Sequence, residues 1–247
     1  MSRILSIGAG VMGTAITIPA VSNGHEAKIV GTSLDEEIID SINKNSVHPK
    51  LNVQLTNTSA LLFNQMTQED IDNSDVIVIG INSSGIDWFI ELIKNFKVVN
   101  KKFLIVTKGL YMNEKKELDI FPNKIKNEIK QDLSLTAVTG PCKAIELAKK
   151  NLTNICFVNS DLDTAINLAN LFKNDYYVIK SQSDLLGAEL CAALKNVYAI
   201  AVGYSQTYFS KEEKIFNPES ALFSHCVNEM SYLVTLMGGL PETVFSL

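Results

Sequence analysis

The sequence lacks several features that mark whole classes of protein. Its formal net charge is −5, so it has no basic excess of the kind that nucleic-acid-binding proteins usually show. No uninterrupted apolar run approaches the roughly 20 residues that a membrane span needs. The opening residues, MSRILSIGAG, contain neither the apolar core nor the cleavage site of a signal peptide. We therefore expect a cytoplasmic protein that binds no nucleic acid and spans no membrane.

Paired cysteines are also missing. The four cysteines are scattered along the chain, with no CxxC pair and no histidines at metal-ligand spacing; they are Cys142, Cys156, Cys191 and Cys226. Such a pattern is typical of reduced thiols, most of them buried as small apolar side chains. The sequence therefore predicts neither a disulfide framework nor a metal site.

Arginine is almost absent, because Arg3 is the single arginine among 22 basic residues. A phosphate dianion is held best by the forked donors of arginine. Any side-chain cation that binds a phosphate group beyond residue 3 must therefore be a lysine.

What the sequence does contain is an alternation of buried strands and helices. The candidate strands are continuous β-branched runs, which is typical of parallel strands covered on both faces. Helical patterns separate them, including residues 33–45 with Ser33 as a cap, and this alternation predicts an open parallel α/β sheet. The strands are expected at residues 3–7, 27–31, 74–81, 101–109, 133–140 and 153–160.

The character of the chain changes near residue 180. Strand patterns stop there, and two long helical patterns follow at 181–205 and 217–238. We therefore expect a Rossmann-type dinucleotide-binding domain over 1–180 and an all-helical substrate and catalytic domain over 181–247.

A glycine-rich turn follows the first strand. Gly8, Gly10 and Gly13 form G-x-G-x-x-G between a strand and a helix, the context in which this motif binds a dinucleotide. Gly8 permits the tight turn, Gly10 lets a pyrophosphate reach the backbone, and Gly13 lets the helix approach the strand. Thr32 and Ser33 stand where a ribose-binding acid is usual, so the preference between NAD and NADP stays open.

Two lysines stand where charge is unexpected. Lys108 ends a buried strand in VTKGL, and Lys195 interrupts the apolar helical stretch GAELCAALKNVYAIAVG. Helical spacing puts Glu189 on one face with Asn196, so polar groups converge beside Lys195. An amine shielded by apolar neighbours exchanges protons near neutral pH more readily than a solvated one.

These motifs together give the chain a family resemblance. GAGVMGTA, VTKGL, GPCKAIELA and GAELCAALKNVYAIAVG, in this order and spacing, resemble the NAD(P)-dependent glycerol-3-phosphate dehydrogenases. The resemblance extends over nearly the whole chain. It implies reduction of dihydroxyacetone phosphate to sn-glycerol 3-phosphate, which supplies the glycerophospholipid backbone, with NAD or NADP as cofactor. It implies a small phosphate-bearing substrate, and a homodimer is one arrangement open to the protein.

The resemblance also implies roles for single residues. Lys195 would be the catalytic acid and base with Asn196 beside it, and Lys108 would contact both cofactor and substrate. Gly140 and Cys142 would lie against the substrate. The cofactor would be bound by Gly8, Gly10, Val11, Met12, Gly13, Thr32, Ser33, Lys108 and Ala144.

The chain departs from the family pattern in places. The family usually has serine at Cys142, an aromatic residue at Lys143 and proline at Asn82. The family's late aspartate and arginine, which contact the lysine and the substrate phosphate, have no counterpart up to Leu247. This pattern predicts an incomplete helical domain, exposed apolar helix surface and poor turnover.

Two other functions are compatible with the motifs. One is a related dehydrogenase of the ketopantoate or opine type, against which the GPCKAIELA turn argues. The other is a catalytically silent protein that binds a dinucleotide for sensing or assembly.

Overall fold

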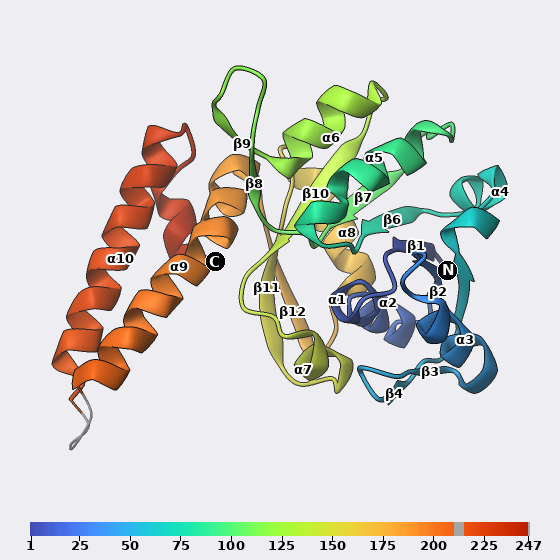
Figure 1. The fold of residues 1–247 in the computed structure, drawn as a ribbon, viewed down its shortest axis with the longest axis horizontal. Coiled ribbons are helices and arrows are strands. Elements are labelled where there is room, and N and C mark those ends of the chain that lie inside the picture. Colours follow the sequence, from blue (N-terminus) through green and yellow to red (C-terminus); the bar gives the residue numbers. More distant parts are fainter. Residues whose placement is uncertain (210–214, 247) are drawn as a thin grey trace.

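The chain is organised around one eight-stranded sheet (Figure 1). The computed structural model describes residues 1–209 and 215–246. The strands are β1 (Arg3–Ile7), β2 (Glu26–Gly31), β5 (Thr58–Leu62), β6 (Val76–Ile79), β7 (Lys102–Ile105), β10 (Ser134–Thr139), β11 (Thr153–Val158) and β12 (Tyr177–Gln182). Their spatial order is β12-β11-β10-β7-β6-β1-β2-β5.

Six of these strands are mutually parallel, and five of the six lie at positions that the sequence predicts; β5 was not predicted, and neither was β12. From β5 through β2, β1, β6 and β7 to β10, every neighbouring pair is parallel. All four residues of β6 are buried, as expected for a strand covered on both faces. This is the strand order of a Rossmann fold, so the predicted fold class is confirmed. The last two strands run the other way: β11 is antiparallel to β10 and parallel to β12.

Helices cover both faces of the sheet (Figure 1). One face packs on α5 (Ile86–Lys94) and α6 (Phe121–Ile129). The other face packs on α1 (Val11–Ala15), α2 (Thr17–Ser22), α3 (Glu36–Asn45) and α8 (Leu162–Phe172). The short elements include α4 (Gln68–Asp72), α7 (Ala144–Ala148) and two small hairpins, β3 (Val47–His48) with β4 (Val53–Gln54) and β8 (Leu110–Met112) with β9 (Leu118–Ile120). Three 3₁₀ helices are η1 (Phe63–Gln65), η2 (Ser83–Gly85) and η3 (Pro241–Ser246).

Ser33 does not cap the third helix, contrary to the sequence prediction. Helix α3 begins at Glu36, and the residue before it is Asp35. The Asp35 carboxylate makes no cap; its Oδ2 atom accepts hydrogen bonds from the amide and the hydroxyl of Thr32, at 2.8 and 2.7 Å. The turn between β2 and α3 is therefore closed by Thr32 and Asp35.

Two long helices follow the sheet, α9 (Leu185–Phe209) and α10 (Asn217–Leu236). The side chain of Asp184 fixes the start of α9, since its carboxylate accepts from the amide of Gly187 at 2.9 Å. It also accepts from the amide of Leu240 at 2.8 Å, which ties the end of the described chain to this point. Leu185 and Ala188 belong to the same apolar core as the sheet residues, so α9 is anchored in the sheet domain. The domain boundary near residue 180 stays a prediction.

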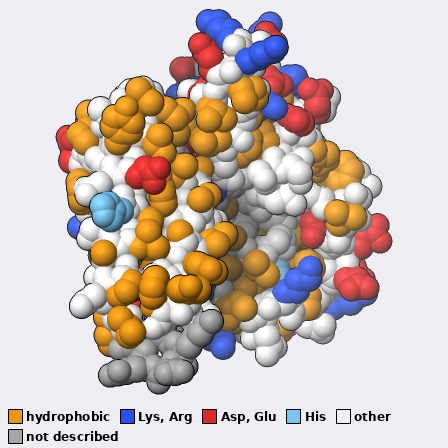
Figure 2. Space-filling model, turned by 60° about the vertical axis from the view of Figure 1, so that its left-hand side comes forward, with side chains coloured by type: hydrophobic (Ala, Val, Ile, Leu, Met, Phe, Trp, Pro, Cys, Tyr) orange, Lys and Arg blue, Asp and Glu red, His pale blue; other side chains and the backbone are white. Residues whose placement is uncertain are grey.

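The second half of α9 leaves the core. Its buried residues lie almost entirely between Leu185 and Ala192, whereas Val197, Ile200 and Tyr204 are exposed. Figure 2 shows hydrophobic side chains spread over the face of the α9–α10 pair. Among the described residues, α9 also has the length and apolar composition of a membrane-crossing helix, with 39% of that stretch buried. This stretch is not an uninterrupted apolar run, because Glu189 and Lys195 lie within α9.

Candidate functional site

The predicted site residues come together at the carboxyl ends of the parallel strands. Ligands of such sheets bind in the crevice where neighbouring connections leave in opposite directions, here between β1 and β6. The glycine-rich turn follows β1, Lys108 follows β7, and Gly140 follows β10. Five loops from distant parts of the sequence therefore meet at one edge, since Thr32 follows β2 and Gly80 follows β6.

Two glycines of the turn are required by internal packing. Gly8 has φ +117°, and a Cβ there would lie 2.5 Å from the carbonyl oxygen of Gly80. A Cβ on Gly13 would lie 2.3 Å from the carbonyl oxygen of Gly8. Gly80 in turn touches Gly13, because its own Cβ would lie 2.5 Å from the Cα of Gly13. Gly80 was not predicted as a site residue, although its position directly after a buried strand was a signal for it.

Gly10 is a glycine for a different reason. Its φ of −66° suits any residue, and a Cβ there would meet nothing closer than 4.0 Å. Gly10 is also exposed, at the start of α1. Neither backbone strain nor packing therefore explains its missing side chain. An open backbone at the start of a helix fits the approach of a dinucleotide pyrophosphate.

A cleft of about 440 Å³ opens beside this turn. Gly10, Thr32, Ser33, Asn82 and Trp88 are among the residues that line it. Its size is within the range of small-molecule and cofactor sites. The cleft therefore joins the glycine-rich turn to the predicted ribose position. Trp88 was not predicted from the sequence as a residue of this cleft.

Thr32 and Ser33 differ in how they face this cleft. Thr32 is half-buried and its hydroxyl donates to Asp35, whereas Ser33 is exposed. Asp35 is the only acid lining the cleft among the described residues, and Thr32 already binds one of its oxygens. The cleft thus presents one carboxylate, which is already partly hydrogen-bonded, and no basic side chain. This lining does not decide between the ribose 2′-hydroxyl of NAD and the 2′-phosphate of NADP as the ligand.

Two lysines lie near each other at this edge of the sheet. The Nζ atom of Lys195 donates to the carbonyl oxygen of Gly140 at 3.4 Å. Burial lowers the pKa of Lys108, and the positive charge of Lys195 lowers it further. Burial raises the pKa of the Cys142 thiol, against the opposing effect of Lys108. Helix α9 and the loops after β7 and β10 thus bring Lys108, Lys195 and Cys142 into one cluster.

Glu189 adds a buried carboxyl to this lysine cluster. The residue is 1% exposed, and its Oε2 atom has no hydrogen-bond partner. Burial raises the pKa of Glu189 to about 8, and the neighbouring Lys108 opposes that rise. The carboxyl is therefore mostly protonated at neutral pH, and the cluster keeps a net positive charge that suits a phosphate-bearing substrate.

Other predicted site residues lie at the edges of these two groups. Asn196 is exposed on α9, so it does not share the buried environment of Glu189 as the helical spacing suggested. Val11 is exposed and Met12 half-buried at the start of α1, and Ala144 is half-buried at the start of α7. Asn196 is exposed because it follows Ala192, after which α9 leaves the core.

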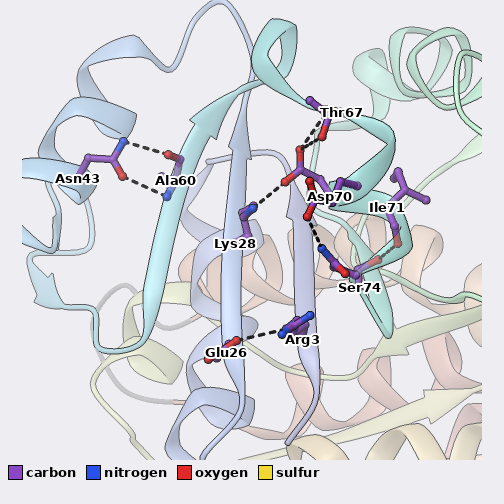
Figure 3. A network of polar contacts seen from close by, with 11 residues as sticks. Arg3, Glu26, Lys28, Asn43, Ala60, Thr67, Asp70, Ile71 and Ser74 are labelled. Carbon is purple, nitrogen blue, oxygen red and sulfur yellow. Dashed lines mark hydrogen bonds and ion pairs between the residues drawn. The ribbon is translucent and has the colours of Figure 1, made fainter.

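A second cleft, of about 460 Å³, is lined by residues of β1, β2 and α4, and Figure 3 shows the polar contacts among several of them. Its cations are already paired: Lys28 contacts Asp70 at 2.6 Å, and Arg3 contacts Glu26 at 3.5 Å. These pairs neutralise the charge of the second cleft, and none of the predicted site residues lines it. Over the described part of the chain, no group of three or more His, Cys, Asp and Glu side chains is placed to hold a metal ion.

Comparison with known protein families gives two matches in chain order. Residues 3–165 match the N-terminal model of NAD-dependent glycerol-3-phosphate dehydrogenase, and residues 184–247 match the C-terminal model. An NADP(+)-dependent glycerol-3-phosphate dehydrogenase of Archaeoglobus fulgidus is 31% identical over 244 residues, which are 98% of this chain and 72% of that protein. A glycerol-3-phosphate dehydrogenase [NAD(P)+] of Bacillus anthracis is 25% identical over 98% of this chain and 69% of its own length.

Solved structures show the same fold. Glycerol-3-phosphate dehydrogenase from Coxiella burnetii superposes with a TM-score of 0.83 at 21% identity, over 99% of this chain and 72% of that one. The Saccharomyces cerevisiae enzyme gives 0.80 at 18% identity, over 98% of this chain and 73% of the other. The chain thus spans somewhat more than two thirds of the length of these relatives.

Proposed function

Because the chain belongs to the NAD-dependent glycerol-3-phosphate dehydrogenase family, we propose that it reduces dihydroxyacetone phosphate to sn-glycerol 3-phosphate with NADH or NADPH. One observation supports this beyond family membership. The open turn at Gly10 and the cluster of Lys108 and Lys195 lie at the same edge of the sheet. A dinucleotide site and a cationic site for a small phosphate substrate are therefore neighbours.

The glycine-rich turn and the adjoining cleft are suited to the dinucleotide. The backbone at Gly10 would receive the pyrophosphate, with Val11 and Met12 beside it. Thr32 and Ser33 would face the adenosine ribose, and Ala144 and Lys108 would lie toward the nicotinamide. When bound, the reduced cofactor supplies a hydride to the carbonyl carbon of the substrate.

Lys195 is the proposed proton donor. A carbonyl carbon that accepts a hydride leaves negative charge on its oxygen, and that oxygen must take a proton. In this proposal the Nζ atom of Lys195 gives that proton, while the Gly140 carbonyl holds the amine in place. Asn196 would orient the substrate from the next position on α9.

Lys108 and the loop after β10 are proposed to hold the substrate. Lys108 carries charge toward the phosphate group, and Gly140 and Cys142 lie against the glycerol moiety. Arg3 is the only arginine within residues 1–247, so the cationic side chains proposed here for the phosphate contacts are lysines. The proposal places the reaction in the cytoplasm, with its product entering glycerophospholipid synthesis.

An assay of NADH and NADPH oxidation with dihydroxyacetone phosphate tests this function. We expect activity with both cofactors and a preference below about 100-fold, since one polar contact discriminates by roughly 1–3 kcal/mol. Dinucleotide binding without any oxidation would favour the catalytically silent alternative. Oxidation with ketopantoate or a 2-oxo acid, but not with dihydroxyacetone phosphate, would favour a related dehydrogenase.

A further inference from the structure

A buried histidine touches the dinucleotide-binding turn from a distant part of the chain. His48 ends the two-residue strand β3, in the hairpin that follows α3. Its side chain is 0% exposed, and its Nε2 atom lies 3.0 Å from the carbonyl oxygen of Ala9. Ala9 stands between Gly8 and Gly10, so the imidazole contacts the middle of the turn.

The hydrogen bonds of His48 fix its protonation. The amide of Leu51 donates to Nδ1 at 3.1 Å, so Nδ1 carries no proton. The single proton of the neutral ring is therefore on Nε2, and Nε2 donates to the Ala9 oxygen. Burial lowers the pKa of His48, which also favours the neutral ring. Both ring nitrogens are thus hydrogen-bonded, Nδ1 to the hairpin and Nε2 to the glycine-rich turn.

Holding the Ala9 carbonyl also holds the next amide. A trans peptide is planar, and its C=O and N–H bonds point in opposite directions. No described peptide bond is cis, so the Ala9–Gly10 peptide has this geometry. With its oxygen held toward His48, its N–H, which belongs to Gly10, points away from the hairpin. Gly10 is the residue of the turn whose missing side chain packing does not explain.

We propose that His48 is a positioning residue, which holds the Ala9–Gly10 peptide so that the Gly10 amide faces the pyrophosphate of the dinucleotide. This inference rests on the proposed function, because it assumes that a dinucleotide binds at this turn. His48 acts through the Ala9 peptide and does not touch the cofactor. The hairpin of β3 and β4 thereby becomes part of the cofactor site.

Two single substitutions each remove one of the two side-chain hydrogen bonds of His48 and keep the other. His48→Gln keeps an N–H donor near the position of Nε2 and loses the acceptor for Leu51. His48→Asn keeps an acceptor near the position of Nδ1 and loses the donor to Ala9. Removing either bond leaves one buried partner unsatisfied, so similar losses of stability are expected. A purely structural histidine would therefore give the two variants equal cofactor affinity.

The readout is the dissociation constant of NADH by fluorescence titration, with melting temperature and circular dichroism as checks of folding. We expect His48→Asn to weaken NADH binding about tenfold and His48→Gln to remain within about twofold of the unaltered chain. Equal affinities in the two folded variants would overturn the role of His48. Failure of the unaltered chain to bind NADH or NADPH would overturn the proposed function itself, and this inference with it.

A second measurement keeps the inference testable if His48→Asn does not fold. Imidazole ¹⁵N spectra of the unaltered chain should show the proton of His48 on Nε2. Saturation with NADH should shift that nitrogen signal, because a ligand on the Gly10 amide polarises the same peptide whose oxygen His48 binds. An unchanged Nε2 signal in the NADH-saturated protein would overturn the coupling.

Discussion

At the scale of single residues, the glycines of the nucleotide turn differ in what they tolerate. Gly10→Val adds a side chain to open space, since the nearest atom to a Cβ there would be 4.0 Å away. We expect this variant to fold normally and to lose NADH binding, because the side chain takes the space proposed for the pyrophosphate. Fluorescence titration of NADH, with circular dichroism as the check of folding, measures both effects. An unchanged affinity for NADH in a folded variant would show that the cofactor does not bind at this turn.

Gly13→Ala is the matched comparison. A Cβ at Gly13 would lie 2.3 Å from the Gly8 carbonyl oxygen, so the helix must move away from the strand. Forcing extra volume into a packed contact usually costs about 1–3 kcal/mol. We expect a lower melting temperature for Gly13→Ala than for Gly10→Val, and thermal unfolding monitored by circular dichroism compares them. A reversed order would contradict the packing argument.

Lys195 is expected to matter for chemistry more than for folding. Lys195→Met keeps the apolar stem and removes the amine, so α9 should remain folded. Turnover of dihydroxyacetone phosphate should fall at least about 10²-fold, the usual scale for losing a general acid. Lys44→Met is the control, since Lys44 is an exposed lysine paired with Asp40 on α3. Near-normal turnover of Lys195→Met would mean that the proton comes from another group.

At the scale of elements, the first half of α9 carries an acid into the core. The pKa of Glu189 is raised by burial to about 8, against an ordinary value of 4.5. Between these values the folded state keeps the proton that the unfolded state releases, so rising pH destabilises the folded chain. Glu189→Gln cannot ionise. We expect the free energy of unfolding of the unaltered chain to fall relative to Glu189→Gln between about pH 4.5 and 8, by up to about 1.4 kcal/mol per pH unit.

Urea unfolding of both proteins at a series of pH values measures this difference. Below about pH 4.5 the difference should be independent of pH, since the carboxyl is then protonated in both states. Parallel stability curves across the whole range would show that Glu189 is already ionised in the folded chain, as a partner of Lys108.

The elements that sequence analysis predicted are those with a local signal. Residues 3–7 and 74–81 are apolar runs between turns, and strands β1 and β6 lie within them. The long helices after residue 181 were predicted from the same kind of pattern, and α9 and α10 match them within a few residues. Strand direction has no local signal, so the reversal at β11 could not be predicted from a pattern that suits either direction.

The candidate site was predictable where motifs are contiguous. The spacing of the motif identifies Gly8, Gly10 and Gly13. An amine among apolar residues is the signal that identifies Lys108 and Lys195. Contacts between distant segments gave no such signal. His48 reaches Ala9 across 39 positions, and no local pattern distinguishes it from a solvated histidine. The exposure of Asn196 likewise depends on where α9 leaves the core, which composition does not reveal.

At the scale of the whole molecule, the α9–α10 pair exposes apolar surface. Val197, Ile200 and Tyr204 share one face of α9 by their spacing, and all three are more than 60% exposed. Exposed apolar patches favour association. We expect concentration-dependent self-association of the 247-residue chain, measured by light scattering after size-exclusion chromatography. The combined substitutions Val197→Gln, Ile200→Lys and Tyr204→Gln should reduce it.

Leu34→Gln serves as the control for self-association. Leu34 is 92% exposed in the sheet domain, far along the chain from the α9–α10 pair. Its substitution should leave the apparent mass unchanged. A monomer at every concentration in the unaltered chain would contradict the prediction.

The contact among Gly8, Gly13 and Gly80 has a consequence for how this chain can change during evolution. Each of the three positions excludes a side chain because backbone of another member already occupies that space. A side chain added at one of these positions would clash with backbone atoms. A second substitution at another of the three cannot relieve that clash, because no side chain is there to be made smaller. Drift and laboratory selection for a new cofactor should leave these three sites invariant. Variation should accumulate instead at Thr32, Ser33 and Asn82, where the neighbouring cleft is open.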